Sequence, residues 1–223
     1  MNKAVVLLSG GLDSATTLYI AKKQGYKCRC LIFDYVQRHK KETEAAKKIA
    51  VLADCPYQVL KIKLPWGGSA LLDKRITVPG RKVTKRAGKD AIPSTYVPGR
   101  NIIFLSFALS FAEVTGAKAV FIGAHIQDYS GYPDCRPEFY RAFKGVVATG
   151  TKAGVEKKEI KIITPLISKN KAQIIRLGKR LGVPLELTWS CYKGGRVPCR
   201  TCDSCYYRSK GFRQAGLKDP LLN

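Results

Sequence analysis

A short run near the amino terminus places a hydroxyl, two glycines and a carboxylate directly after a hydrophobic strand. The apolar run Val5 to Leu8 is followed by Ser9-Gly10-Gly11-Leu12-Asp13-Ser14. Glycines let a backbone approach an anion closely, and the first N–H groups of a helix favour negative charge. Since helical spacing begins at Ala15, the run predicts a phosphate-binding turn between a strand and a helix. The plainer alternative is a strand–helix corner with a serine cap. The spacing is not G-x-x-x-x-G-K-[ST] or G-x-G-x-x-G.

Four cysteines near the carboxyl end have the spacing of a metal site. Seven, two and two residues separate Cys191, Cys199, Cys202 and Cys205. Four thiolates at these spacings can close a tetrahedral zinc site that has no position left for water, which predicts a structural ion. An iron–sulfur cluster is the alternative, because C-x2-C-x2-C also occurs in iron–sulfur proteins. The other four of the eight cysteines lie in core-like segments.

Polar loops follow three of the predicted strands. Ligands bind beyond the carboxyl ends of the strands in open parallel sheets, so these loops are expected to share one crevice. The first is the Ser-Gly-Gly turn, the second is 34–39 and the third is 125–136. In the second loop, Arg38 and His39 can meet a phosphate or a carboxylate, and the alternative for His39 alone is a surface histidine before a charged helix. Arg100, after Pro98-Gly99, is a bidentate donor for the same groups.

The third loop combines acceptors with aromatic rings. Asp128 and Asp134 are the acceptors, and Gly131 shapes the turn between them. Tyr129 and Tyr132 can enclose a flat heterocycle, although core packing would explain one such tyrosine easily. The loop therefore predicts a site for a small planar ligand.

The elements that must position these loops follow a β-α-β-α-β order over the first 62 residues. Strands are predicted at 5–8, 28–35 and 57–62, and a helix at 41–53 has Ala45, Ile49 and Leu52 on one face. Residues 102–113 are apolar nearly all round and predict a buried helix. Further strands are predicted at 119–123 and 160–163, and Ser168 is the predicted N-cap of the helix that follows. The fold class is α/β, with a parallel five-stranded twisted sheet flanked by helices.

Two segments lie outside this alternation. Residues 64–95 are rich in Gly, Pro and paired basic residues, and they predict either a loop that contacts RNA or ATP or a solvated flap. Residues 187–223 hold the four cysteines. The chain is therefore divided into a nucleotide-binding domain, 1–186, which contains the basic loop, and a small zinc-binding subdomain, 187–223.

The composition is strongly basic. Among 223 residues, 40 are Lys or Arg and 16 are Asp or Glu, for a net charge of +24. Such a surface attracts polyanions, and it gives a reason to expect weak RNA affinity. No apolar stretch approaches the roughly 20 residues that span a bilayer, and no leader precedes the first strand. We expect a cytoplasmic protein without membrane association.

Several motifs together resemble one family. The run 9–14 resembles the pyrophosphate loop of the N-type ATP pyrophosphatases. That run, Asp34-Tyr35-x-Gln37-Arg38-His39, Pro98-Gly99-Arg100-Asn101, the string 128–139, Thr188-Trp189-Ser190-Cys191-Tyr192 with the later cysteines, and Gly211-Phe212-x-x-Ala215-Gly216 resemble the 7-cyano-7-deazaguanine synthase family. The resemblance runs from the first strand to the tail, and the string 128–139 is its most specific part.

The resemblance implies a fold like that of the adenine nucleotide alpha hydrolases, a homodimer, and a ligase that uses ATP with Mg²⁺. The substrates would be 7-carboxy-7-deazaguanine and ammonia, and the product would be the nitrile. Asp13, Arg38 and Lys171 would be catalytic. ATP would contact Leu8, Ser9, Gly10, Gly11, Leu12, Asp13, Ser14 and Arg100. The deazapurine would contact Arg38, His39, Arg100, Asn101, Asp128, Tyr129, Ser130, Gly131, Tyr132, Asp134 and Arg136.

Two features depart from the family pattern and keep other functions open. The net charge of +24 exceeds what a small-molecule enzyme needs, and Arg196 stands where an acidic residue is expected. The alternative function is a tRNA-modifying enzyme with the same loop, which would thiolate or amidate RNA directly and grip its phosphates. A zinc-containing RNA-binding protein without catalysis is a third candidate.

Overall fold

The computed structural model describes residues 1–80, 92–125 and 131–222 of the chain. Within them, five strands form one parallel sheet in the order β3-β2-β1-β4-β5. The strands are β1 (Lys3–Leu7), β2 (Lys27–Asp34), β3 (Tyr57–Lys61), β4 (Ala119–Phe121) and β5 (Lys161–Ile163). The predicted fold class is confirmed.

The central strand β1 is buried on both faces. Ala4 and Val6 belong to one hydrophobic cluster, whereas Val5 and Leu7 belong to another on the opposite face. This arrangement explains the unbroken apolar run, because a parallel strand covered by helices on both sides needs no polar face.

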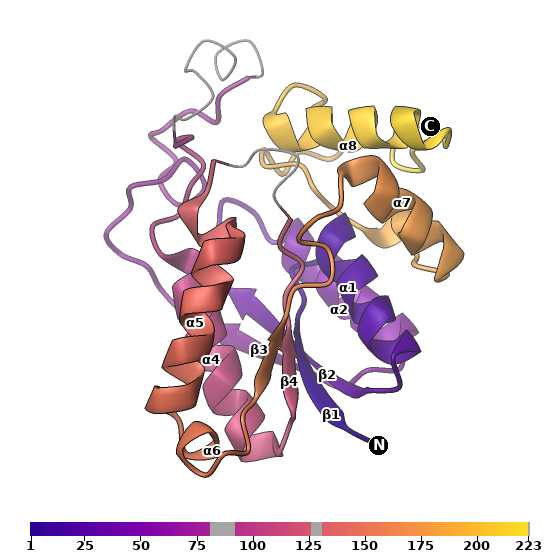
Figure 1. Cartoon of the computed structure of the whole chain (residues 1–223). Helices are drawn as coiled ribbons and strands as arrows, with labels where there is room; N and C mark the ends of the chain where they lie inside the picture. Colours follow the sequence, from indigo (N-terminus) through magenta and orange to yellow (C-terminus); the bar gives the residue numbers. More distant parts are fainter. Residues whose placement is uncertain (81–91, 126–130, 223) are drawn as a thin grey trace.

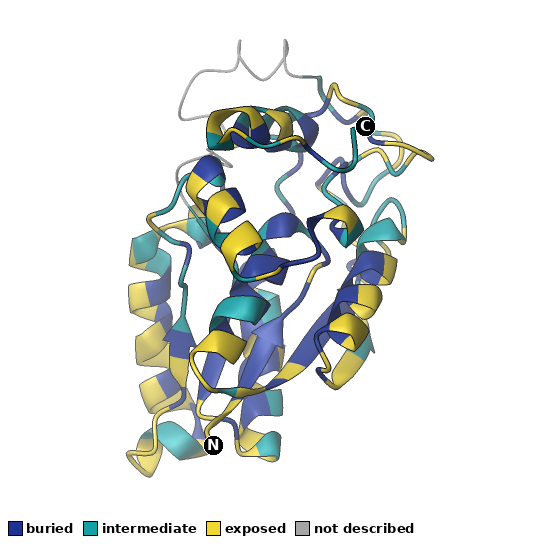
Figure 2. Cartoon of the chain, turned by 90° about the vertical axis from the view of Figure 1, so that its right-hand side faces the viewer, coloured by how far each residue is buried: buried dark blue, intermediate teal, exposed yellow. Residues whose placement is uncertain are grey.

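Helices cover the two faces of the sheet (Figure 1). One face carries α1 (Leu12–Lys23), α2 (Lys41–Leu52) and α7 (Lys171–Arg180), and the other carries α4 (Arg100–Thr115) and α5 (Pro137–Gly150). Figure 2 shows the resulting pattern, with buried residues at the sheet and exposed residues on the outer sides of the helices.

The topology places a crevice at the end of β1. β1 pairs with β2 on one side and with β4 on the other. The first connection therefore runs toward one edge of the sheet, and the later strands are added toward the other edge. Such a switch point opens a crevice beyond the carboxyl ends of the strands. The Ser-Gly-Gly turn, which joins β1 to α1, lies at this edge.

The prediction that residues 102–113 form a buried helix is wrong in one respect. The helix α4 forms, and Leu105, Ala108 and Ala112 are fully buried. However, Ile102 is 48% exposed and Phe107 is 41% exposed. Only one side of α4 faces the sheet, and no described element covers its outer side.

The predicted N-cap of the helix after β5 is also wrong. Asn170, and not Ser168, caps α7. The Asn170 side chain accepts from the Gln173 backbone N–H at 2.9 Å, and the Gln173 side chain accepts from the Asn170 N–H at 2.9 Å. This reciprocal pair is a capping box, which satisfies two helix-terminal donors at once.

The carboxyl-terminal region packs onto the body of the protein. It contains a 3-10 turn (Leu185–Leu187) and α8 (Asp203–Ala215), whose Phe212 belongs to the same cluster as Ile174. The buried Arg208 guanidinium donates to both carboxylate oxygens of Asp219, at 2.8 and 2.9 Å. The remaining short elements are a 3-10 turn (Pro133–Cys135) and α6 (Lys152–Val155). Among the described residues, no helix combines the length and apolarity that crossing a membrane requires.

Candidate functional site

The hydroxyl groups of Ser9 and Ser14 fix the conformation of the Ser-Gly-Gly turn. Ser14 Oγ accepts from the Ser9 N–H at 3.1 Å and donates to the Gly11 carbonyl at 3.1 Å. Ser9 Oγ lies 3.0 Å from Ser14 Oγ and accepts from the Gly11 N–H at 3.3 Å. The turn therefore enters α1 as a pre-shaped cradle, next to helix N–H groups that favour an anion.

Two glycines allow neighbouring elements to press against this cradle. Gly10 has a φ of +84°, and a Cβ there would lie 2.1 Å from the Glu42 carbonyl oxygen in the first turn of α2. Gly123 follows β4, and a Cβ there would lie 2.9 Å from the Asp13 carbonyl carbon. The glycines at these positions set the distance between the turn, α2 and the end of β4.

An ionic cluster forms at the start of α1. Lys171 Nζ lies 2.9 Å from both Asp13 carboxylate oxygens, and His125 Nε2 lies 3.2 Å from Asp13 Oδ2. His125 Nε2 also lies 3.0 Å from Lys171 Nζ. Burial works to raise the pKa of Asp13, but Lys171 and His125 outweigh it and hold that pKa well below its usual range. Asp13 is therefore an anion that Lys171 and His125 hold in place.

A cavity of about 990 Å³ opens between this cradle and a group of aromatic side chains. Its lining includes the cradle residues Leu8, Ser9, Gly11, Leu12, Asp13 and Ser14, together with Lys171. Tyr35, Phe104, Tyr132 and Tyr192 form the aromatic part of the wall. The volume lies at the upper end of the range typical of small-molecule sites.

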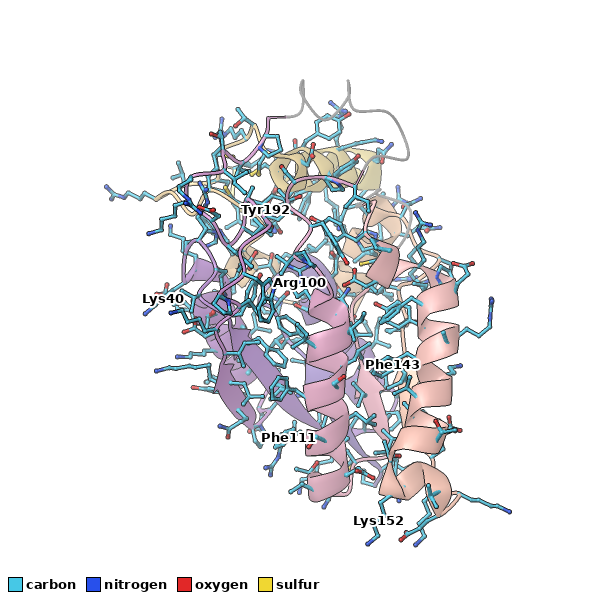
Figure 3. The ribbon with its side chains drawn as sticks, turned by 90° about the vertical axis from the view of Figure 1, so that its left-hand side faces the viewer. Lys40, Arg100, Phe111, Phe143, Lys152 and Tyr192 are labelled. Atoms are coloured by element: carbon cyan, nitrogen blue, oxygen red, sulfur yellow. The ribbon has the colours of Figure 1, made fainter. Side chains whose placement is uncertain are left out.

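Arg100 is the cation of the aromatic end. It stands at the start of α4 and donates to the Tyr35 hydroxyl at 3.3 Å. Figure 3 shows Arg100 at the upper end of α4 with Tyr192 above it, whereas Phe111 lies near the lower end of the same helix. Tyr132 also joins this end, where its hydroxyl lies 2.9 Å from Thr95 Oγ1. The aromatic end thus combines flat rings, hydroxyls and one guanidinium.

Asn101 and Asp134 bind each other behind this wall. The Asn101 N–H donates to Asp134 Oδ2 at 2.9 Å, and its side-chain amide donates to the Asp134 carbonyl at 3.1 Å. Asn101 lines the cavity with Gly131, whereas Asp134 is 4% exposed and is not part of the lining. Burial raises the pKa of Asp134, and the Asn101 hydrogen bond works against that rise. The pair ties the start of α4 to the turn before α5.

Arg38 and His39 do not line the cavity. The Arg38 guanidinium donates to the carbonyl oxygens of Ala70, Asp73 and Ile76, at 3.1, 3.1 and 2.7 Å. His39 Nε2 lies 2.9 Å from the Cys191 carbonyl oxygen. Both side chains thus hold neighbouring segments in place around the site.

The remaining predicted ligands are divided between described and undescribed parts of the chain. Asp128, Tyr129 and Ser130 lie outside the described residues. Arg136 is exposed at the start of α5. Its contribution to a ligand stays a prediction, as do those of the other predicted site residues.

The four cysteines form one compact group, as their spacing predicts. Their sulfur atoms all lie within 4.8 Å of one another, and Cys199 Sγ lies 3.9 Å from Cys205 Sγ. The Cys199 N–H donates to Cys191 Sγ at 3.3 Å, and the Cys202 N–H donates to Cys199 Sγ at 3.4 Å. Amide donors of this kind stabilise thiolates, which are the form of cysteine that binds metal. The group can therefore hold a metal ion.

His125 and Glu42 line the cavity but were not among the predicted site residues. His125 follows β4, and only its place in a strand-end loop pointed to it. Glu42 lies in the first turn of α2, where an acidic residue is expected simply to stabilise a helix terminus. Burial raises the pKa of Glu42 to about 7, partly offset by Arg100, and Cys191 adds to the rise. No local pattern distinguishes Glu42 from Glu44, because only the contact between Gly10 and α2 brings Glu42 into the cavity.

Comparisons with known proteins agree with this arrangement. The family model described as queuosine biosynthesis protein QueC matches residues 3–216. The 7-cyano-7-deazaguanine synthase of Trichodesmium erythraeum (strain IMS101) is 51% identical over 222 residues, which cover 99% of this chain and 100% of that protein. The enzyme of the same name from Acetivibrio thermocellus is 52% identical over 222 residues, 99% of this chain and 97% of its own.

A solved structure supports the fold independently. The NMN synthetase from Francisella tularensis superposes with a TM-score of 0.51 at 16% identity, over 99% of this chain and 80% of that chain. At this identity the likeness concerns the fold alone. The family match, by contrast, spans nearly the whole sequence, including the cradle, the aromatic wall and the four cysteines. The chain belongs to the QueC family of queuosine biosynthesis proteins.

Proposed function

We propose that this protein converts 7-carboxy-7-deazaguanine and ammonia to 7-cyano-7-deazaguanine at the expense of ATP. The observation that carries the proposal is the near-full-length identity of about half to enzymes named 7-cyano-7-deazaguanine synthase. The cavity supports it, because an anion cradle and an aromatic wall share one space.

The reaction explains why the anion cradle and the aromatic wall must lie next to each other. A carboxylate is a poor acyl electrophile, so its oxygen attacks the α-phosphorus of ATP, forming an acyl adenylate and releasing pyrophosphate. Ammonia then displaces AMP and loses a proton, which leaves an amide. The amide oxygen attacks the α-phosphorus of a second ATP and releases a second pyrophosphate. Loss of AMP and a proton from this adenylate forms the nitrile.

The residues of the cradle have the properties that these steps require. Ser9, Ser14 and the N–H groups at the start of α1 would bind the β,γ-phosphates, and Lys171 would add positive charge beside them. Mg²⁺ would neutralise phosphate charge, with Asp13 as the carboxylate nearest the cradle. Arg100 would contact the substrate carboxylate or the α-phosphate. Arg38 and His39 would act by holding the walls of the site.

We infer that the metal of the four-cysteine group is zinc. A tetrahedral ion with Zn–S bonds of about 2.3 Å places its sulfurs about 3.8 Å apart, and Cys199 and Cys205 are 3.9 Å apart. All four ligands would be protein thiolates, so this ion would stabilise the fold and take no part in turnover. Metal analysis tests the inference, since stoichiometric zinc is expected, and an absorption band near 400 nm would show an iron–sulfur cluster.

We further propose a cytoplasmic homodimer that binds RNA weakly through its basic surface. The exposed residues Ile102 and Phe107 on α4 support the dimer, because a second copy could cover them. The division into residues 1–186 and 187–223 stays a proposal about organisation, although α8 shares the cluster of Ile174.

A direct assay tests the activity. The purified protein is incubated with ATP, ammonium and 7-carboxy-7-deazaguanine, and mass spectrometry follows the nitrile and AMP. Two AMP per nitrile are expected, with no nitrile when ATP or ammonium is omitted or when Asp13→Ala replaces the wild type. Absence of nitrile, together with AMP release that depends on added tRNA, would overturn the proposal in favour of the tRNA-modifying alternative. The comparisons do not favour that alternative.

A further inference from the structure

Within the described part of the chain, Glu42 differs from Asp13 and Asp134 in the partners of its carboxylate. Asp13 pairs with Lys171 and His125, and Asp134 accepts from the Asn101 N–H. The Glu42 carboxylate has no hydrogen bond or ion pair with any of the described residues, although it lines the cavity. Glu42 is half-buried in the cavity wall, so its two acceptor oxygens are available to donors on a ligand that enters the cavity.

The main chain fixes where this carboxylate stands. The Glu42 carbonyl oxygen packs against Gly10 so closely that a Cβ on Gly10 would lie 2.1 Å from it. The first turn of α2 therefore cannot move away from the cradle without opening that contact. Glu42 thus belongs to a rigid part of the wall, which is what selective recognition requires.

The groups around Glu42 suit a flat ligand. Tyr35, Tyr192 and Arg100 line the same cavity as Glu42. Phe104 completes the wall at 5.4 Å from the Tyr35 ring, centroid to centroid. A planar ring system between these side chains would present its edge, and not its face, to the carboxylate.

One edge of a deazaguanine matches a carboxylate. The ring N1–H and the exocyclic 2-amino group are adjacent donors that point the same way, and a carboxylate offers two acceptor oxygens for them. The oxygen O6 lies next to N1–H on the same edge, whereas the substituent at position 7 lies on a different edge, so this contact leaves the reacting group free.

We propose that Glu42 binds the N1–H and 2-amino edge of the deazapurine and makes the enzyme specific for 2-amino substrates. This inference rests on the proposed function, since it assumes that the deazapurine is the substrate. Glu42 touches the substrate in this role but takes no part in adenylation. In this assignment Asp13 serves the nucleotide, and Glu42 selects the base.

The test compares two substrates with two enzymes. 7-Carboxy-7-deazahypoxanthine lacks only the 2-amino group, so wild-type kcat/KM should fall at least about a hundredfold with it, because an unpaired donor or acceptor in a built site is strongly disfavoured. In Glu42→Gln, kcat/KM for the natural substrate should fall about a hundredfold, mainly through KM. The ratio between the two substrates should then shrink to about tenfold or less.

Glu44→Gln is the matched control. Glu44 lies in the same helical turn but is exposed, so this variant should keep both the activity and the ratio of the wild type. Glu42→Asp should recover part of the discrimination. Calorimetric titration with the deazapurine in the absence of ATP measures the same preference without turnover.

Two results would overturn the assignment. One is a Glu42→Gln enzyme that keeps the wild-type ratio between the substrates. The other is a variant that loses kcat while KM and the ratio stay unchanged, which would assign Glu42 to a chemical step. A wild-type enzyme that forms no nitrile would instead contradict the proposed function, a separate outcome from either of these.

Discussion

Neighbouring groups give the two carboxylates of one cavity, Asp13 and Glu42, different properties. Asp13 and Glu42 are both carboxylates of its lining. Lys171 and His125 lower the pKa of Asp13, whereas burial raises that of Glu42 to about 7. The two carboxylates therefore differ in charge near neutral pH, as two groups with different tasks require.

Replacing Lys171 by Met should weaken ATP binding and turnover. The change removes a cation that lies 2.9 Å from both Asp13 oxygens and next to the proposed phosphate site. A charged hydrogen bond contributes about 1.5–3 kcal/mol, so kcat/KM for ATP should fall about ten- to a hundredfold. AMP release at varied ATP concentration measures the effect. Lys179→Met, exposed on the same helix, should behave like the wild type, and an unaltered Lys171→Met enzyme would contradict the role of Lys171.

The pKa of Glu42 predicts a pH-dependent stability difference. Because its folded pKa of about 7 lies above the unfolded value of about 4.3, the folded state binds the proton more tightly. The contribution of this protonation to the free energy of unfolding is complete below the unfolded pKa and is lost as the pH rises through 7. The side chain of Glu42→Gln cannot ionise. The Tm of this variant minus that of the wild type, both without ligand, should therefore increase as the pH rises from 5 to 8. A difference that is independent of pH, as expected for Glu44→Gln, would count against this pKa.

At the scale of elements, the contact between the cradle and α2 decides the geometry of the site. Gly10 has a φ of +84° and would meet the Glu42 carbonyl through a Cβ, whereas Gly25 has a φ of +81° and would meet nothing within 4 Å. Comparing substitutions at the two glycines therefore separates the energetic cost of a left-handed backbone from the cost of a steric clash.

Gly25→Ala should lower the free energy of unfolding by about 1–2 kcal/mol, which is the cost of a left-handed conformation for a residue with a Cβ. Gly10→Ala should cost about 1–3 kcal/mol more, because the methyl group must displace α2. Denaturant titration measures both variants, and the nitrile assay should show a loss of activity for Gly10→Ala alone. Equal destabilisation of the two variants would show that α2 can shift to accommodate the methyl group with no loss of stability.

The elements also show what sequence patterns can and cannot predict. The five strands and their parallel orientation follow from apolar runs that alternate with amphipathic helices. The exposed side of α4 was not predicted, because an apolar sequence does not say which elements will cover it. Ser168 and Asn170 are both good caps, and the choice depended on the reciprocal bond with Gln173. The helices α5 and α8 have no counterpart among the predicted elements.

The site was predictable where a short motif carries the chemistry. The cradle and the grouping of the four cysteines follow from spacing within short segments. Glu42 and His125 were missed because they enter the cavity through contacts between distant segments, with Gly10 in one case and with Asp13 and Lys171 in the other. Arg38 is bound to carbonyl groups of residues 70–76, which no local pattern indicates.

At the scale of the molecule, the four-cysteine group holds together segments that are far apart in sequence. Cys191, Cys202 and Cys205 share a small cluster with Ala70 and Val78, and Gly80 pairs with Cys202 in an antiparallel bridge. None of the described members of this cluster belongs to the sheet, so a metal ion there would add a link between these segments that the sheet does not provide.

Cys199→Ala should therefore lower the Tm and release the metal, because metal binding is coupled to folding. Metal content by elemental analysis and thermal melts with and without a chelator measure the two effects. Cys28→Ala, which removes a buried thiol far from the group in sequence, should retain the metal and lose only the stability of a small cavity. A Cys199→Ala protein that folds normally but is inactive would contradict the structural role.

Residues 34–43 connect the three working parts of the protein through one stretch of backbone. Arg38 donates to the segment beside the four-cysteine group, His39 lies against the Cys191 carbonyl, and Glu42 packs against the glycine turn. An insertion or deletion of one residue here would shift all three together. Efforts to retarget the enzyme to new bases should therefore exchange side chains at fixed length in this stretch, and place any change of length elsewhere.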